Sequence, residues 1–127
     1  YENGQQRRKS KFKDDERNGT YKAWYENGQL QTVAEYKGGM KDGSSKEWYE
    51  NGQQFGIAEF ENGVLNGTGK LWYENGQLQE KGDFKNGERN GSYRAWYENG
   101  QKRVKAKYSD GKIVGTPKEW YENGQKK

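Results

Sequence analysis

Glutamates recur at a fixed spacing in this 127-residue chain, and carboxylates are the side chains here that could support acid–base or metal chemistry. They lie at Glu2, Glu26, Glu50, Glu74, Glu98 and Glu122. If each unit adds two strands, successive glutamates lie roughly 10 Å apart, too far for an acid–base pair or a metal cage. The chain has no His and no Cys, so the commonest general base, the soft metal ligands and the thiol nucleophile are missing. We therefore expect a non-enzymatic protein with no catalytic residue, metal site or cofactor.

Basic side chains form a second regular row, which could bind anions. Its members are Lys22, Lys46, Lys70, Arg94 and Lys118. Such a row suits anionic lipid headgroups or a polyanion, but lysines on exposed strands also discourage sheet aggregation. The net charge is only +4 and the two signs interleave along the chain. We therefore expect no specific nucleic-acid binding, and a membrane surface is the less favoured partner.

Apolar side chains concentrate in the middle of the chain, whereas the corresponding positions of the outer units are mostly charged. The candidate partner-binding residues are Val33, Phe55, Ile57, Leu65, Leu71, Trp48 and Trp72. A contiguous apolar patch rimmed by charge usually marks a protein-binding site. Strict strand alternation would place Val33, Phe55 and Ile57 on the same face as the tryptophans. The alternatives are that the patch packs inside a curled sheet or against a second copy of the chain.

A five-residue sequence, Tyr-Glu-Asn-Gly-Gln, sets the framework that must position these side chains. It begins at Tyr1, Tyr25, Tyr49, Tyr73, Tyr97 and Tyr121, so the repeat length is 24 residues (25 − 1 and onward). The expected units are 1–24, 25–48, 49–72, 73–96 and 97–120, with a partial unit at 121–127. We expect one repeat array, and a piece of a longer one. Because each unit of such an array touches mainly its neighbours, its function should lie in an extended surface.

Each unit is predicted to form one β-hairpin. Asn27-Gly28 lies between two strand-like runs, which favours a two-residue turn with positive φ at both central residues. This turn would place Tyr25 opposite Leu30, and no segment has a helical period. The predicted fold is therefore all-β: an elongated, single-layer antiparallel sheet of tandem hairpins.

The same register pairs an invariant glycine with an aromatic residue in every unit. Gly19 would face Tyr36, and we expect the ring to cover the bare backbone of the glycine. The tryptophans at the ends of the units would lie on the opposite face, unless a bulge returns them to the aromatic one. Asp14-Asp15 replaces the glycine-type turn in the first unit, and Pro117 indicates an edge or bulge position.

These features, namely an aromatic residue followed by a glycine-containing turn and the run Trp-Tyr-Glu-Asn-Gly-Gln, resemble the MORN repeat, and in particular its bacterial variant form. The resemblance covers the whole chain and implies hairpins aligned in one elongated sheet. It also implies a protein-binding antitoxin or immunity protein that blocks a cognate toxin. The alternatives are a membrane- or polyanion-associated scaffold and a structural array that self-assembles through its sheet edges.

The composition indicates an ordered but thin protein. Only 28% of the residues are hydrophobic, yet 15% are aromatic, and disordered chains are poor in aromatic residues. The sequence contains no apolar run long enough for a membrane span or a signal peptide, and no cysteine that would indicate a redox compartment. The compartment stays open, with the cytoplasm favoured.

Overall fold

The computed structural model describes residues 8–9, 12–13 and 16–127, and every regular element in them is a strand. The predicted turn at Asp14-Asp15 lies outside the described residues. The strands are β1 (Arg8–Lys9), β2 (Phe12–Lys13), β3 (Glu16–Arg17), β4 (Gly19–Trp24), β5 (Leu30–Lys37), β6 (Met40–Trp48), β7 (Gln54–Glu61), β8 (Val64–Leu65), β9 (Gly67–Trp72), β10 (Leu78–Lys85), β11 (Glu88–Trp96), β12 (Lys102–Ser109) and β13 (Lys112–Glu119).

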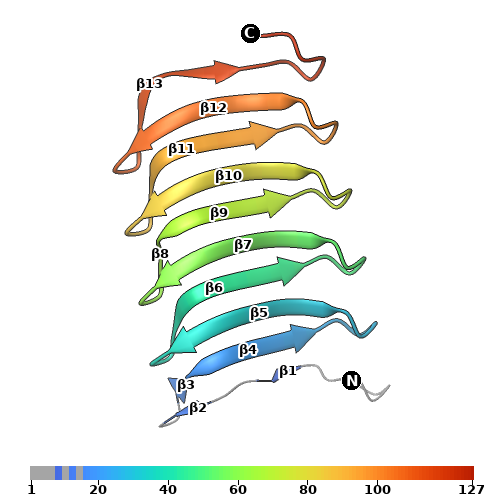
Figure 1. The fold of residues 1–127 in the computed structure, drawn as a ribbon, viewed down its shortest axis with the longest axis vertical. Coiled ribbons are helices and arrows are strands. Elements are labelled where there is room, and N and C mark those ends of the chain that lie inside the picture. Colours follow the sequence, from blue (N-terminus) through green and yellow to red (C-terminus); the bar gives the residue numbers. More distant parts are fainter. Residues whose placement is uncertain (1–7, 10–11, 14–15) are drawn as a thin grey trace.

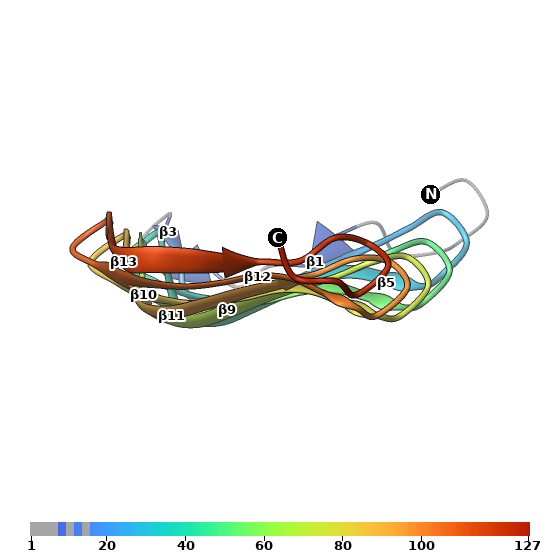
Figure 2. The same cartoon turned by 90° about the horizontal axis from the view of Figure 1, so that it is seen from above.

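Eleven of these strands form one open antiparallel sheet. Its order is β1-β4-β5-β6-β7-β9-β10-β11-β12-β13, with β8 also paired to β7, while β2 and β3 form a separate small sheet. From β4 onward each strand follows its predecessor in space as in sequence, so the sheet lengthens in one direction (Figure 1). Viewed from above, the strands overlie one another in a single bowed layer (Figure 2). The predicted all-β, single-layer architecture is confirmed.

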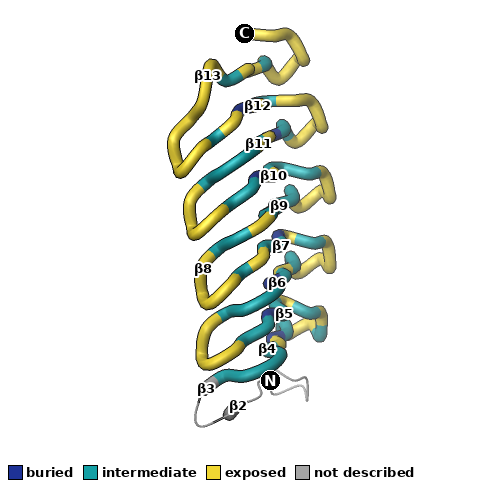
Figure 3. Tube along the Cα trace, turned by 60° about the vertical axis from the view of Figure 1, so that its left-hand side comes forward, coloured by how far each residue is buried: buried dark blue, intermediate teal, exposed yellow. Residues whose placement is uncertain are grey.

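The described part of the chain has a core made of small side chains. The buried residues with side chains are Ala23, Ala34, Ala95, Ala106 and Ser45, and no large side chain is fully buried among the described residues. These buried positions form a narrow band along the sheet, between strand ends and turns that are exposed (Figure 3). Stability must therefore come largely from contacts between neighbouring units.

The Tyr-Glu-Asn-Gly-Gln turn differs from the predicted two-residue turn. Tyr25 N donates to Gln29 O (2.8 Å) and Gly28 N to Tyr25 O (3.0 Å), which closes a three-residue loop. Gly28 has a φ of +89°, whereas Asn27 stays outside the left-handed region and accepts a hydrogen bond from Gln29 N at its Oδ1 (2.9 Å). This local hydrogen bond favours a type I turn followed by a left-handed glycine over the predicted mirror-image turn.

The change of turn shifts the pairing near the loop by one residue. Leu30 pairs with Trp24 instead of Tyr25, and a bulge between Leu30 and Thr32 then restores the predicted register, with Ala23 opposite Thr32. The same shift recurs at the corresponding position of β7, β10 and β12. Each of these hairpins therefore carries a bulge beside its Tyr-Glu-Asn-Gly-Gln turn that the sequence interpretation did not place.

Two-residue turns with positive φ connect the strands at the ends opposite the Tyr-Glu-Asn-Gly-Gln turns. Asn62 and Gly63, with φ of +51° and +81°, connect β7 to β8, and the corresponding residues of the other units behave alike. Gly63 N also donates to Lys41 O (2.7 Å) of the preceding unit. A main-chain hydrogen bond therefore connects this turn to the preceding unit.

The predicted pairing of glycine with an aromatic residue is confirmed, but the predicted reason for it is wrong. Gly43 pairs with Phe60, and the equivalent pairs recur in the other units. Gly43 has a φ of +107°, and a Cβ at this position would lie 3.3 Å from Glu35 Cβ rather than against a ring. The backbone conformation and the close glutamate require the glycine. Pro117 lies on the edge strand β13 where its register shifts, as predicted.

Candidate functional site

The two faces of the sheet differ in chemistry. On one face, which we call the aromatic face, Tyr21 and Tyr36 meet edge to face with ring centroids 6.2 Å apart, and Tyr93 and Tyr108 do the same at 6.0 Å. The opposite face, which we call the basic face, carries the row that begins at Lys22. The two faces therefore present two separate candidate binding surfaces.

A hollow of about 330 Å³ opens on the aromatic face in the middle units, and we call it the central groove. Its walls include Phe55, Phe60, Leu65, Leu71, Phe84 and Tyr93. Its floor is formed by the backbone of strands β7, β9 and β10, with Gly56, Gly69 and Gly82 and the main-chain oxygens of Ile57 and Lys70. The volume lies at the lower end of the range typical of ligand sites, and the lining is mostly apolar with a few polar groups.

The groove lies where one row of equivalent positions on the aromatic face has small residues in place of tyrosines. Positions 24 residues apart on the aromatic face carry Tyr21, Ser45, Gly69 and Tyr93. The two tyrosines fill the space beside Tyr36 and Tyr108, but Ser45 and Gly69 leave it empty. The Phe84 ring lies close to the floor, with Cε2 3.5 Å from the place of a Cβ on Gly69. The sequence of the units therefore explains the position of the groove.

Charged side chains lie at both ends of the groove. Lys41 Nζ lies 5.0 Å from the centroid of the Phe60 ring, and Arg89 Cζ lies 5.1 Å from that of Phe84. Both contacts fall within cation–π range. Glu47 and Glu80 line the groove on the side of the Tyr-Glu-Asn-Gly-Gln turns. The groove thus has an apolar middle, cations at one end and carboxylates at the other.

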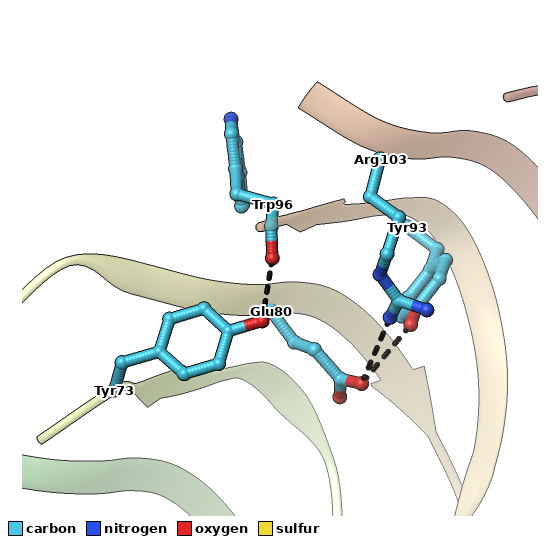
Figure 4. A network of polar contacts seen from close by, with 5 residues as sticks. All are labelled: Tyr73, Glu80, Tyr93, Trp96 and Arg103. Carbon is cyan, nitrogen blue, oxygen red and sulfur yellow. Dashed lines mark hydrogen bonds and ion pairs between the residues drawn. The ribbon is translucent and has the colours of Figure 1, made fainter. Parts of the chain in front are cut away.

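Glu80 is held by a small polar network (Figure 4). Tyr93 donates its hydroxyl to Glu80 Oε1 at 3.2 Å, and Arg103 Nη2 lies 3.9 Å from the same oxygen. Burial raises the pKa of Tyr93 above its ordinary value near 10, and the charge and hydrogen bond of Glu80 raise it further against the opposing effect of Arg103 and Arg89. Tyr93 therefore stays protonated and acts as a hydrogen-bond donor at neutral pH.

The basic face carries a continuous row across the sheet. Successive strands pair Lys22 with Val33, Val33 with Lys46, Lys46 with Ile57 and Ile57 with Lys70. The row continues through Lys81, Arg94, Lys105 and Lys118. All five predicted anion-binding residues therefore lie in this one row, in which Val33 and Ile57 are the apolar members.

Trp96 and Trp120 lie beside the same row. They line a shallow pocket of about 50 Å³ together with Arg94 and Lys105, and Lys102 Nζ lies 5.7 Å from the Trp120 ring centroid. The bulge in each unit therefore does not return these indoles to the aromatic face.

The predicted partner-binding residues separate between the two faces. Phe55, Leu65 and Leu71 line the central groove, and Ile57 borders it through its main-chain oxygen beside Gly69. The side chains of Ile57 and Val33 belong to the basic row. Placing Phe55 on the same face as Val33 and Ile57 was wrong, because Phe55 occupies the bulge between Gln54 and Gly56, where alternation breaks. Its ring instead contacts that of Tyr49, with the centroids 5.1 Å apart.

Trp48 and Trp72 have a structural contact that the sequence interpretation missed. Their main-chain oxygens accept hydrogen bonds from the hydroxyls of Tyr25 (2.6 Å) and Tyr49 (2.7 Å), and neither tryptophan lines the groove. The same bond joins Tyr73 to Trp96 O at 2.8 Å (Figure 4). Burial, followed by Glu50, raises the pKa of the Tyr25 hydroxyl.

The asparagine of the repeated sequence adds a second bond between units. Asn27 Nδ2 donates to Glu50 O at 2.9 Å, and Asn51, Asn75 and Asn99 make the corresponding contact with the following unit. The strict invariance of Tyr and Asn was the sequence feature that could have revealed these bonds. Among the described residues, no group of three or more metal-ligating side chains comes together, and no helix is long and apolar enough to cross a membrane.

Comparison with known families gives two matches. The sequence profile described as MORN repeat variant matches residues 17–37, 41–62, 65–86 and 89–110, and the one described as MORN repeat matches residues 81–92. No curated protein matches the chain. The four variant matches begin 24 residues apart (41 − 17 and onward), which agrees with the spacing of Tyr-Glu-Asn-Gly-Gln. The boundaries between units stay a prediction.

Proposed function

Because this chain belongs to the MORN repeat variant family, whose repeats are modules for protein or membrane interactions, we propose that it is a non-enzymatic protein-binding module acting through its central groove. The observation that supports this proposal most is the position of the groove. Phe55, Leu65 and Leu71, which differ in kind from their counterparts in most other units, line one open apolar hollow. Well-packed apolar pockets at the centre of an interface supply most of the binding energy in protein complexes.

Paired substitutions on the two faces test this proposal. Leu71→Asp places a carboxylate in the groove, and Ile57→Asp places one on the basic face of the neighbouring strand. A partner captured from the source cells by the unaltered chain is purified, and its affinity for each variant is measured by calorimetry. We expect at least a tenfold loss for Leu71→Asp and little change for Ile57→Asp, with both variants keeping the circular dichroism of the parent. Equal losses, or a loss confined to Ile57→Asp, would refute the groove as the site.

The narrower proposal is that the partner is a toxin and that this chain is its antitoxin or immunity protein. The resemblance of the repeat array to bacterial variant proteins of that kind supports it, as does a broad surface able to cover another protein's active site. The test expresses the purified partner's gene in a bacterial host with and without this chain. Growth arrest that the chain relieves, and that Leu71→Asp fails to relieve, is the expected result. A partner that is harmless when expressed alone would overturn the toxin assignment.

The basic face supports a second candidate, association with an anionic membrane or a polyanion. The row that runs from Lys22 to Lys118 contains seven cationic residues, interrupted only by Val33 and Ile57. Cosedimentation with phosphatidylserine vesicles at low and at high salt tests it. Binding that salt abolishes and that Lys46→Glu with Lys70→Glu removes is the expected outcome, and binding that these changes leave intact would contradict it.

The third candidate is a homo-oligomer formed through the sheet edges. Among the described strands, β13 pairs with β12 alone. Its outer edge is covered at one end, where Glu119 O accepts a hydrogen bond from Lys127 N (2.9 Å), and the rest of that edge faces no described strand. Exposed edge strands readily pair between molecules. Light scattering over a range of concentrations tests this candidate, since a mass that rises with concentration is expected and a constant monomer mass would exclude it.

A further inference from the structure

We propose that the central groove accepts an aromatic side chain of the protein partner, adjacent to a basic residue, in the place where the chain's own row lacks a tyrosine. This inference rests on the proposed function and names the chemistry of the occupant. The repeats supply the template for it, because equivalent positions in other units show what fills that space.

The flanking units each hold a complete set of three groups. Tyr21 meets Tyr36 edge to face, and Arg17 Cζ lies 4.5 Å from the Tyr21 centroid. In the later unit Tyr93 meets Tyr108, and Arg89 Cζ lies 4.4 Å from the Tyr93 centroid. Each set thus consists of a first ring (Tyr36 or Tyr108), which we call the wall ring, a second ring (Tyr21 or Tyr93) packed edge to face against it, and an arginine over the second ring.

The middle units keep the wall rings but lack the second ring. Phe60 and Phe84 occupy the positions of Tyr36 and Tyr108, and Lys41 remains near Phe60 at 5.0 Å. Ser45 and Gly69 stand where the second ring would begin. Over Ser45, an aromatic side chain from outside would therefore meet a ring and a cation, Phe60 and Lys41, as Tyr21 and Tyr93 do within the chain. Over Gly69 it would meet the Phe84 ring in the edge-to-face geometry that aromatic pairs prefer, with the apolar Leu65 at the position of the cation.

The backbone does not require the glycine at position 69. Gly67, two residues earlier, has a φ of +115° and a Cβ there would lie 3.1 Å from Glu59 Cβ, so this glycine is needed for the fold. Gly69 has no positive φ, and its Cβ would make ordinary contacts, 3.5 Å to Phe84 Cε2 and 3.9 Å to Ile57 O. What Gly69 contributes is the open space above it.

The charges around the groove favour a basic residue next to the aromatic one. Glu47 lines the groove, and its carboxylate has no hydrogen-bond or ion-pair partner in the described part of the chain. Glu80, on the same side, already accepts the Tyr93 hydroxyl and lies near Arg103. If the partner's ring lies over Gly69, an Arg or Lys next to it in the partner's sequence would thus pair with Glu47. This charge complementarity also fixes the orientation of the partner in the groove.

Dipeptide probes test the occupant directly. N-acetyl-Tyr-Arg-amide is titrated into the full chain while the backbone amide resonances of Gly56, Gly69 and Gly82 are followed by NMR. We expect saturable shifts at these three glycines, and binding at least fivefold weaker for N-acetyl-Tyr-Glu-amide and for N-acetyl-Ala-Arg-amide. Absence of shifts with the Tyr-Arg probe, or equal binding of the Ala-Arg probe, would overturn the proposal.

A substitution that restores the missing ring gives an independent test. Gly69→Tyr should fill the groove from within, keep the fold, and weaken binding of the Tyr-Arg probe at least tenfold. Lys70→Tyr adds the same ring to the basic face of the same strand and should bind the probe like the parent. Ser45→Tyr, in the same row one unit earlier, serves if Gly69→Tyr does not fold. Unchanged probe binding with the groove filled would overturn the proposal.

The two proposals fail in distinguishable ways. If Leu71→Asp abolishes binding of the native partner but the Tyr-Arg probe does not bind, the groove is the protein-binding site and its occupant is not an aromatic side chain. If the probe binds the groove and the native partner is unaffected by Leu71→Asp, the groove recognises the ring but the protein partner docks elsewhere.

Discussion

The hydroxyl of Tyr73 should contribute measurably to stability through a single bond between neighbouring units. It donates to Trp96 O at 2.8 Å, and Tyr73→Phe removes this bond while leaving the ring in place (Figure 4). A net hydrogen bond of this kind contributes about 1 kcal/mol. Tyr25, Tyr49 and Tyr97 make the same bond, and sites roughly 10 Å apart add nearly independently, so replacing all four should cost about 4 kcal/mol.

Urea unfolding measures this loss. Tryptophan fluorescence and circular dichroism are recorded together, because coincident transitions are needed before a free energy of unfolding is assigned. In a repeat array stability is nearly a sum of unit and interface contributions, so a weakened interface should lower the midpoint. A total stability of about 5–15 kcal/mol is typical of domains, which makes the fourfold variant strongly destabilised.

Tyr121→Phe is the matched control. Tyr121 occupies the same repeat position, is 53% exposed, and its hydroxyl has no hydrogen-bond partner among the described residues. The free energy of unfolding should therefore hardly change. Equal losses in Tyr73→Phe and Tyr121→Phe, or no loss in either, would refute the view that these hydroxyls hold the units together.

Three further predictions concern the same framework. Asn75→Asp keeps the acceptor for the turn but removes the donor to Glu98 O (3.1 Å), so we expect a loss of about 1 kcal/mol by urea unfolding, and an unchanged midpoint would contradict this. Gly67→Ala should destabilise by about 1–3 kcal/mol because of its positive φ, whereas Gly69→Ala on the same strand should be neutral or stabilise by about 0.5–1 kcal/mol; the opposite order would be inconsistent with the backbone described. The raised pKa of Tyr93 means that the folded state favours its protonated form, so its contribution is complete below about pH 10 and is lost as the pH rises through the raised value. Unfolding midpoints from pH 9 to about pH 12 should fall less steeply in Tyr93→Phe, and identical slopes would exclude this role.

The fold was predictable because one pattern recurs without a slip. The 24-residue spacing, the strand-like runs and the glycine positions lead directly to a single-layer sheet, and pairs such as Gly19 with Tyr36 follow from them. The turn type was not predictable from Asn27-Gly28 alone. Asn27 accepts a hydrogen bond from Gln29 N and so stays outside the left-handed region, whereas Asn62-Gly63 adopts the two-residue turn.

The candidate site was only partly predictable, because it depends on register and on empty space. Periodicity identified Leu65 and Leu71 as members of an apolar centre, but the bulge at Phe55 decides which face that side chain takes. The groove itself arises because Ser45 and Gly69 carry no aromatic ring, in a row of equivalent positions where Tyr21 and Tyr93 do. A search for prominent side chains overlooks such positions, although comparing the units with one another reveals them.

A structure of the chain bound to its purified partner tests the central claim most directly. We expect an aromatic side chain of the partner over Gly69, in edge-to-face contact with Phe60 or Phe84, and a basic residue of the partner beside Glu47. A partner seated on the row from Lys22 to Lys118, with the central groove left open, would contradict it.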